Sequence, residues 1–183
     1  MRILHTRNIL VSLLLMAGLA TATTVIPLSV ETLALNSSHV LEGQATQSWS
    51  EWNQQHTMIF TYTKFQVLRA LKGSAPGVVV VKQMGGSAEG YTQRVAGVRH
   101  WVSGEHAVLF LRPSMARDGT MEVTGLMQGN FLVRRAANGE LTVSNGLPGV
   151  SAYEAASNRI AGYQGSALRL KDLESRVRKA VQP

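Results

Sequence analysis

Two aromatic side chains and a basic one occupy every second position from Phe60 to Lys64, the part of the chain best suited to binding a ligand. In an extended strand, Phe60, Tyr62 and Lys64 share one face. Aromatic rings beside a basic group stack on sugar rings or on nucleic-acid bases, although large aromatic side chains are also common in protein cores. Two more aromatic residues lie in a glycine-rich segment farther along the chain. The sequence therefore predicts a ligand-binding surface formed by Phe60, Tyr62, Lys64, Tyr91 and Trp101.

Catalysis by this chain would depend on its histidines. His100, Glu105 and His106 lie at the end of the glycine-rich segment, but they lack the i, i+4 helical spacing of zinc signatures. A serine hydrolase also needs a marked nucleophile, and the sequence contains no Gly-x-Ser-x-Gly elbow. We therefore expect no metal and no cofactor. A hydrolase that uses His100 or His106 is kept as an alternative.

Residues 1–22 have the composition of an export signal. Arg2 and Arg7 precede an unbroken run of apolar or small residues that ends at Ala20, and this run is shorter than the roughly 20 residues that cross a bilayer. Ala20-Thr21-Ala22 offers small residues at the positions that a signal peptidase reads. We expect cleavage after Ala22, export to the bacterial periplasm or the cell exterior, and no transmembrane segment in the rest of the chain.

Residues 23–183 have the size and composition of one globular domain. The chain is 45% hydrophobic and only 16% charged, which argues against general disorder. It contains no cysteine, and this excludes disulfides, thiolate metal sites, a cysteine nucleophile and a lipoprotein anchor. Export without cysteine favours a periplasmic protein over a small disulfide-rich one.

The net charge of +7 is unevenly distributed along the chain. From Ser151 onward, bases outnumber acids, and the bases are Arg159, Arg169, Lys171, Arg176, Arg178 and Lys179. Such a cluster either meets an anionic partner or is a solvated helix face. Export argues against nucleic acid, so we expect a cell-envelope glycan or protein as the partner of a monomer.

Most of the domain has the pattern of β-strands. Ser29 is placed to cap a short helix that ends before Ser37. Runs of β-branched, aromatic and aliphatic residues then predict strands within 39–48, 57–71, 78–81, 106–112, 121–127, 131–135 and 140–144. The run 78–81 is apolar at every position, as in a central strand covered on both faces. Residues 83–104 contain many glycines and are expected to form a long loop.

Turn and helix signals complete the predicted fold. Asn138-Gly139 predicts a β-hairpin with a type I′ turn. Residues 153–160 are expected to form a short helix, and a second helix follows with an apolar stripe at Leu170, Leu173, Val177 and Val181. This helix is expected either to dock on the domain or to lie on a membrane surface. We expect an α+β, mainly β fold: a small antiparallel barrel or curled sheet at 23–150 and a helical segment at 151–183.

The order of these features resembles a group of exported bacterial proteins of uncharacterised function. The resemblance is carried by Ser29-x-Glu31-x-Leu33, Val40-x-x-Gly43, Val67 to Gly73, Gly85-Gly86 and Gly104 to Leu111. More distantly, the layout is similar to the OB-type barrel of the tissue-inhibitor and netrin-module families. That likeness implies an OB-like barrel. It does not imply metalloprotease inhibition, because the inhibitory N-terminal cysteine of those families has no counterpart here.

These observations together favour a binding module. The expected contact surface combines the face around Phe60 and Tyr62 with the glycine-rich segment. A structural subunit of an envelope complex is a further alternative, in which an edge strand or the basic helix docks on a partner.

Overall fold

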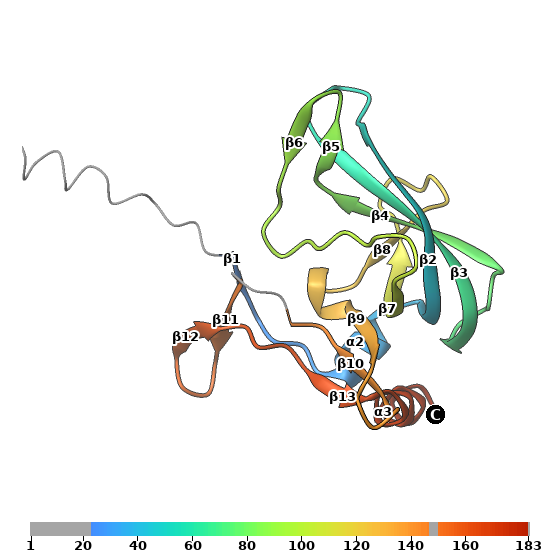
Figure 1. Cartoon of the computed structure of the whole chain (residues 1–183). Coiled ribbons are helices and arrows are strands. Elements are labelled where there is room, and N and C mark those ends of the chain that lie inside the picture. Colours follow the sequence, from blue (N-terminus) through green and yellow to red (C-terminus); the bar gives the residue numbers. More distant parts are fainter. Residues whose placement is uncertain (1–22, 147–149, 183) are drawn as a thin grey trace, which may run out of the picture.

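A ring of five strands forms the centre of the computed structural model, which describes residues 23–146 and 150–182 (Figure 1). The strands are β2 (His39–Trp52), β3 (Ile59–Lys72), β4 (Val78–Met84), β7 (His106–Pro113) and β8 (Met121–Val123). Antiparallel pairing runs in the order β7-β2-β3-β4, and β8 closes the ring by pairing with both β4 and β7. The fold is mainly β with a short helix near each end of the described chain, as predicted, and the closed barrel is compatible with an OB-like barrel.

The barrel interior follows the alternation expected from the sequence. In β3, Thr61, Thr63 and Phe65 are buried, while Phe60 and Tyr62 are half-buried on the outer face. A single apolar cluster fills the barrel, with buried members Leu41, Ala45, Phe65, Val79, Val81, Trp101, Ala107, Leu109 and Leu111. The prediction that Phe60, Tyr62 and Lys64 share one face is therefore confirmed, and the structure shows that this is the outer face.

A second core lies between the sheet and two helices. Strands β9 (Asn130–Arg135), β10 (Leu141–Ser144) and β13 (Ala167–Arg169) extend the sheet beyond β7, and the helices are α2 (Val30–Asn36) and α3 (Leu170–Val181). Because these elements cover its outer side, β7 is buried on both faces, with Val108 and Phe110 in this core. The sequence predicted such a strand at 78–81 instead. That prediction is wrong, since the Val78 side chain is 46% exposed.

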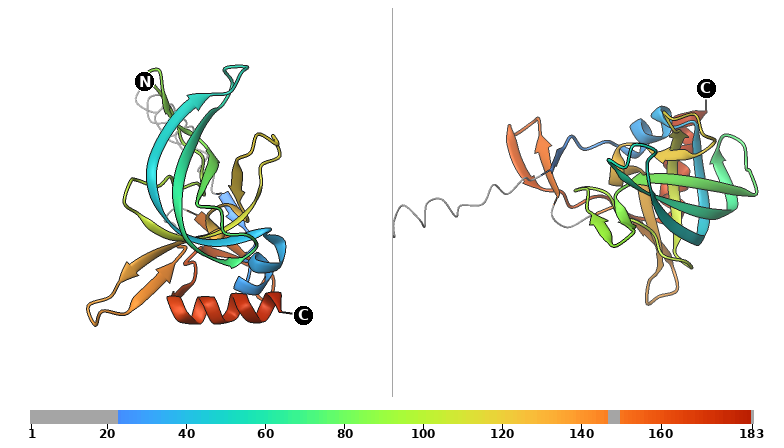
Figure 2. Two further views of the ribbon diagram at one scale, coloured as in Figure 1. Left: turned by 90° about the vertical axis from the view of Figure 1, so that its right-hand side faces the viewer. Right: turned by 90° about the horizontal axis from the view of Figure 1, so that it is seen from above.

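The predicted cap of the first helix and the predicted apolar stripe of the C-terminal helix are both present. The Ser29 hydroxyl accepts a hydrogen bond from Thr32 N (3.0 Å) and caps α2. The apolar stripe of α3 is docked on the domain, with Leu173 and Val177 fully buried. Arg176 of α3 also pairs with Glu31 of α2 (2.6 Å), which joins the two helices. The left view of Figure 2 shows α3 lying across the base of the molecule.

Two segments differ from the prediction. Within the expected loop 83–104, β5 (Gly86–Ala88) and β6 (Tyr91–Gln93) form a small hairpin. The expected helix at 153–160 is wrong, because β11 (Val150–Glu154) and β12 (Arg159–Gly162) form a hairpin there. Strand β1 (Thr23–Val25) pairs in parallel with β11, and this partner lies too far away in the sequence for local propensity to reveal it. The three strands project to one side of the barrel (Figures 1 and 2).

The hairpin predicted at Asn138-Gly139 connects β9 and β10, but its turn is not type I′. Gly139 has a positive φ of 82°, whereas Asn138 does not. Gly139 N donates to Ala136 O, as in a type I turn followed by a left-handed glycine. The 3₁₀ helix η1 (Leu126–Gly129) links β8 to β9. Among the described residues, no helix is long and apolar enough to cross a membrane.

Candidate binding site at the barrel seam

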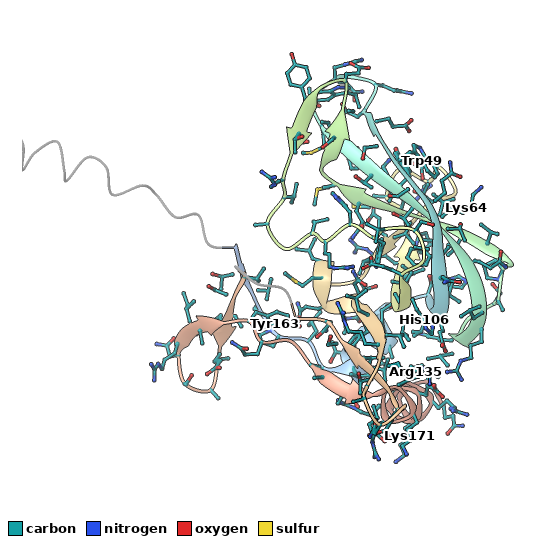
Figure 3. The ribbon with its side chains drawn as sticks, in the orientation of Figure 1. Trp49, Lys64, His106, Arg135, Tyr163 and Lys171 are labelled. Carbon is teal, nitrogen blue, oxygen red and sulfur yellow. The ribbon has the colours of Figure 1, made fainter. Side chains whose placement is uncertain are left out.

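The predicted outer face of β3 joins side chains from both neighbouring strands. Trp49 of β2 lies opposite Tyr62, and their rings stack with centroids 5.5 Å apart. Lys82 of β4 lies opposite Tyr62 on the other side. We call Trp49, Phe60, Tyr62, Lys64 and Lys82 the aromatic face; Trp49 and Lys64 mark it in Figure 3. Three of its members were predicted, while Trp49 and Lys82 come from strands that pair with β3 only in the fold.

Lys82 is held firmly on the aromatic face. Its Nζ lies 4.6 Å from the centroid of the Phe60 ring and 5.5 Å from that of Tyr62, and it donates to Asp118 Oδ2 at 3.1 Å. Burial by itself would lower the pKa of Lys82, but the hydrogen bond to Asp118 and the proximity of Tyr62 raise it. Lys82 is therefore a fixed cation that covers part of both rings.

Hydrogen bonds also fix the carboxylate of Asp118, which pairs with Lys82. The Thr120 hydroxyl and backbone N–H both donate to Asp118 Oδ1, and the Thr120 hydroxyl is the strongest influence that lowers the pKa of Asp118 to about 2. Lys82 lowers it further. The Lys82–Asp118 pair is therefore charged at any physiological pH.

A cavity of about 280 Å³ opens beside this face, at the junction of β4 and β8. The two strands form one residue pair, Val81 with Met121. We call this cavity the seam pocket. Its lining comes from β3, β4, β7, β8, η1 and two connecting segments, and consists of Phe60, Lys82, Gln83, Met84, Gly97, Val98, Arg112, Met115, Glu122, Val123 and Leu126.

Exposed apolar side chains surround the pocket. Met84 is 37% exposed, Leu126 is 39% exposed and Met115 is 84% exposed. Flexible methionine side chains adapt to apolar partners of varied shape. Leu126 also has a positive φ of 58°, a strained conformation for a bulky residue and one that is frequent at functional sites. The rim therefore combines exposed apolar surface with backbone strain.

Charged groups at the pocket are paired with one another. Arg112 lies 3.5 Å from Glu122, which also accepts a hydrogen bond from the Ser114 hydroxyl at 3.0 Å. One polar atom of a lining residue is unpaired: Gln83 Oε1 is buried and has no hydrogen-bond partner within the described chain. Its amide nitrogen donates to Arg99 O (3.1 Å), which fixes the orientation of the amide. The site is thus mainly apolar, without excess charge.

Trp101 and Tyr91, the other two residues of the predicted ligand-binding surface, lie elsewhere. Trp101 is 2% exposed inside the barrel, where its ring meets Phe65 edge-on and its indole N–H donates to Asn130 Oδ1 (3.0 Å). Tyr91 is 65% exposed, and its ring contacts that of Trp52 near the tip of the β2–β3 hairpin. The structure therefore brings together Phe60, Tyr62 and Lys64, and it places Tyr91 and Trp101 outside this group.

The two candidate catalytic histidines lie in different environments. His100 Nε2 is 3.0 Å from Met84 O. His106 Nε2 is 2.8 Å from Glu42 Oε1, and Glu42 also pairs with Arg69, which reaches Glu174 of α3. No serine hydroxyl is bonded to either ring in the described chain, and residues 23–146 and 150–182 contain no group of three metal-ligating side chains.

A second cavity, of about 680 Å³, lies between the β5–β6 hairpin, residues 94–98 and Val150. Its lining includes Ser87, Thr92, Arg94 and His100 and contains no carboxylate. Gly97 and Val98 line both cavities, so this short segment separates them. The glycine-rich segment predicted as part of the contact surface does contribute walls to both.

Sequence reasoning missed most of the seam pocket. Met84, Met115 and Leu126 are far apart in the chain, and only closure of the ring brings them together. No protein-family model and no curated protein matches the chain. The function is therefore inferred from the site itself.

Proposed function

We propose that this protein is an exported, non-catalytic binding module of the bacterial cell envelope, and that its ligand contacts the seam pocket and the aromatic face. The observation that carries this proposal is the apolar pocket with three exposed apolar side chains at its rim. Exposed apolar clusters next to a cavity are typical of binding sites, because burial by a partner removes that surface from water.

The chemistry of the pocket favours an envelope protein over a glycan. A glycan needs open aromatic faces, yet Trp49 and Tyr62 stack on each other and Lys82 covers Phe60 and Tyr62. The pocket itself offers apolar walls and paired charges, which suit an apolar side chain of a protein. A glycan would bind more readily in the larger cavity, whose mixed lining includes Ser87, Thr92 and Arg94, so glycan binding is the second candidate.

Export and family are part of the same proposal. Cleavage after Ala22 would leave Thr23, the first residue of β1, free to pair with Val150. The barrel and its flanking helices support membership in the group of exported proteins with an OB-like barrel. We propose that the protein acts as a monomer in the periplasm or outside the cell and does not bind nucleic acid.

Two alternatives predict different behaviour. A hydrolase that uses His100 or His106 would lose turnover when both are replaced. A structural subunit would dock through an edge strand or the basic face of α3, and its association would not depend on the seam pocket.

The proposal is tested by capture from solubilised host envelope, followed by an affinity measurement with each identified protein or glycan. Met115→Lys places a charge at the rim, and because Met115 is 84% exposed the fold should tolerate it. The matched control is Ile160→Lys, at an exposed apolar residue of β12. We expect Met115→Lys to weaken binding about tenfold or more, whereas Ile160→Lys has no effect. Equal binding by both variants would contradict the proposal.

Tyr62→Ala tests the aromatic face separately. The side chain is half-buried on the outside of the barrel, so we expect weaker capture together with a thermal midpoint close to that of the wild type. A loss of folding would show that the ring is a structural element instead. Circular dichroism melting distinguishes the two outcomes.

A further inference from the structure

The larger cavity, which lies between the β5–β6 hairpin, residues 94–98 and Val150, has the size of a small-molecule site; we call it the hairpin cavity. Its volume of about 680 Å³ falls within the range of about 300–1,000 Å³ that is typical of such sites. The hairpin contributes Ser87 and Thr92, Arg94 follows it directly, and β11 contributes Val150. The hairpin and β11 lie on the same side of the barrel (Figures 1 and 2).

Arg94 gives the hairpin cavity a positive charge that the described chain does not neutralise. The side chain is exposed and forms no ion pair with any described residue, and no carboxylate lines the cavity. By contrast, the arginines that line three other cavities, Arg69, Arg99 and Arg112, are each paired with a glutamate. Arg94 is therefore placed to pair with an anion from outside the chain.

The uncharged polar groups of the lining suit the hydroxyl groups of a sugar. The hydroxyls of Ser87 and Thr92 lie 2.8 Å apart, so one donates to the other and the second keeps its proton for a ligand. His100 Nε2 lies 3.0 Å from Met84 O, and because a carbonyl only accepts, this nitrogen carries a proton and leaves Nδ1 of the neutral ring as an acceptor. The lining also includes apolar side chains that can contact the C–H groups of a sugar ring, namely Val95, Ala96, Val98 and Val150.

We propose that the hairpin cavity binds a carboxylated saccharide, whose carboxylate pairs with Arg94 and whose hydroxyls bond to Ser87 and Thr92. A carboxylate matches the planar guanidinium, since the two groups can form a pair of parallel hydrogen bonds. A phosphate monoester carries a charge of about −1.5 to −2 at pH 7, more than this one guanidinium neutralises. This site goes beyond the binding proposed at the seam pocket, because the two cavities share only Gly97 and Val98.

Calorimetric titration tests the charge recognition with trigalacturonate, trimannuronate and the methyl ester of each trisaccharide. The esters keep the sugar rings but lack the charge, so we expect the acids to bind at least about tenfold more tightly. Arg94→Gln should weaken binding of the acids about tenfold or more. The matched control is Lys179→Gln on α3, which removes the same charge at an exposed residue outside the cavity and should have no effect.

Thr92→Val tests the contact with the sugar hydroxyls, because valine has a similar shape but cannot form hydrogen bonds. We expect binding of the acids to weaken about threefold to tenfold, with an unchanged thermal midpoint since Thr92 is exposed. Acetate is the control for a site that recognises only an anion, and it should bind far more weakly than the acidic trisaccharides.

Three outcomes would overturn the inference: no binding of either acid at millimolar concentration, equal affinity for acid and ester, or equal effects of Arg94→Gln and Lys179→Gln. Acetate that binds as tightly as the trisaccharides would also overturn it, because the sugar would then contribute nothing. None of these results bears on protein binding at the seam pocket, which Met115→Lys tests separately. The two proposals can therefore fail independently.

Discussion

Proline substitutions at Gln83 and Met84 test whether the backbone of β4 has the orientation that its register requires. The register with β3 directs the N–H of Gln83 to Thr61 O, whereas the N–H of Met84 points away from β3. Proline has no N–H and is tolerated in a sheet only where that group is not needed. The two adjacent positions should therefore respond very differently.

The expected difference follows from the environment of Thr61. Thr61 is 4% exposed, so its carbonyl oxygen has little access to water once the donor is lost. An unsatisfied buried acceptor costs about 1–3 kcal/mol, and disruption of the ladder brings the cost of proline at position 83 to about 3 kcal/mol. Proline at position 84 loses no bond to β3, so its cost should be smaller, about 1 kcal/mol or less. The expected difference is therefore about 2 kcal/mol.

Urea unfolding measures both effects, with Gln83→Ala and Met84→Ala as reference proteins. These references remove the side-chain contribution, including the Gln83 bond to Arg99 O. At a slope of about 2 kcal/mol per molar urea, the two proline variants should differ in midpoint by roughly 1 M relative to their references. Equal losses, or a larger loss at Met84, would refute the assigned orientation of the β4 backbone.

Other predictions concern the helices. Leu173→Ala should lower the free energy of unfolding by about 2–5 kcal/mol in chemical denaturation because Leu173 is fully buried, while Ser175→Ala on the exposed side should have little effect. Glu31→Gln should destabilise the protein at pH 7 by at most about 1 kcal/mol, because Arg176 lowers the pKa of Glu31 to about 2 while both groups remain partly exposed. This stabilisation is complete above the ordinary pKa of 4.5 and disappears as the pH falls to about 2, so unfolding curves of wild type and variant should converge there; a constant difference would contradict the assignment. Lys72→Met should cost about 1–2 kcal/mol in thermal unfolding, since Lys72 Nζ donates to Ala34 O (2.8 Å) and Ser37 O (2.7 Å) at the end of α2; no change would contradict a capping role.

Local patterns in the sequence predicted the parts of the fold that depend on local periodicity. The alternation from Phe60 to Phe65 identified the outer face of β3, and the stripe through Leu173 identified the docked side of α3. The hairpin at 150–162 was missed because its alanines favour a helix, while its stability depends on pairing with β1, which begins at Thr23. Propensity is a weak guide when a distant strand supplies the partner.

The binding site likewise has one part that could be predicted from the sequence and one part that could not. Phe60, Tyr62 and Lys64 come from one strand, so their common face could be predicted. The seam pocket depends on how β8 closes the ring between β4 and β7, and no local pattern determines this. Lys82 and Met115 therefore had no signal in the sequence that linked them to Phe60.

The way the barrel closes explains why this position is the strongest candidate for function. The chain leaves β8 after Val123, and two successive left-handed residues, Gly125 (φ 69°) and Leu126 (φ 58°), turn it into η1. The result is strained backbone and exposed apolar surface at one place, and both reduce the stability of the isolated protein. A partner that covers the apolar rim would remove the second of these costs, which makes this position the strongest candidate for binding.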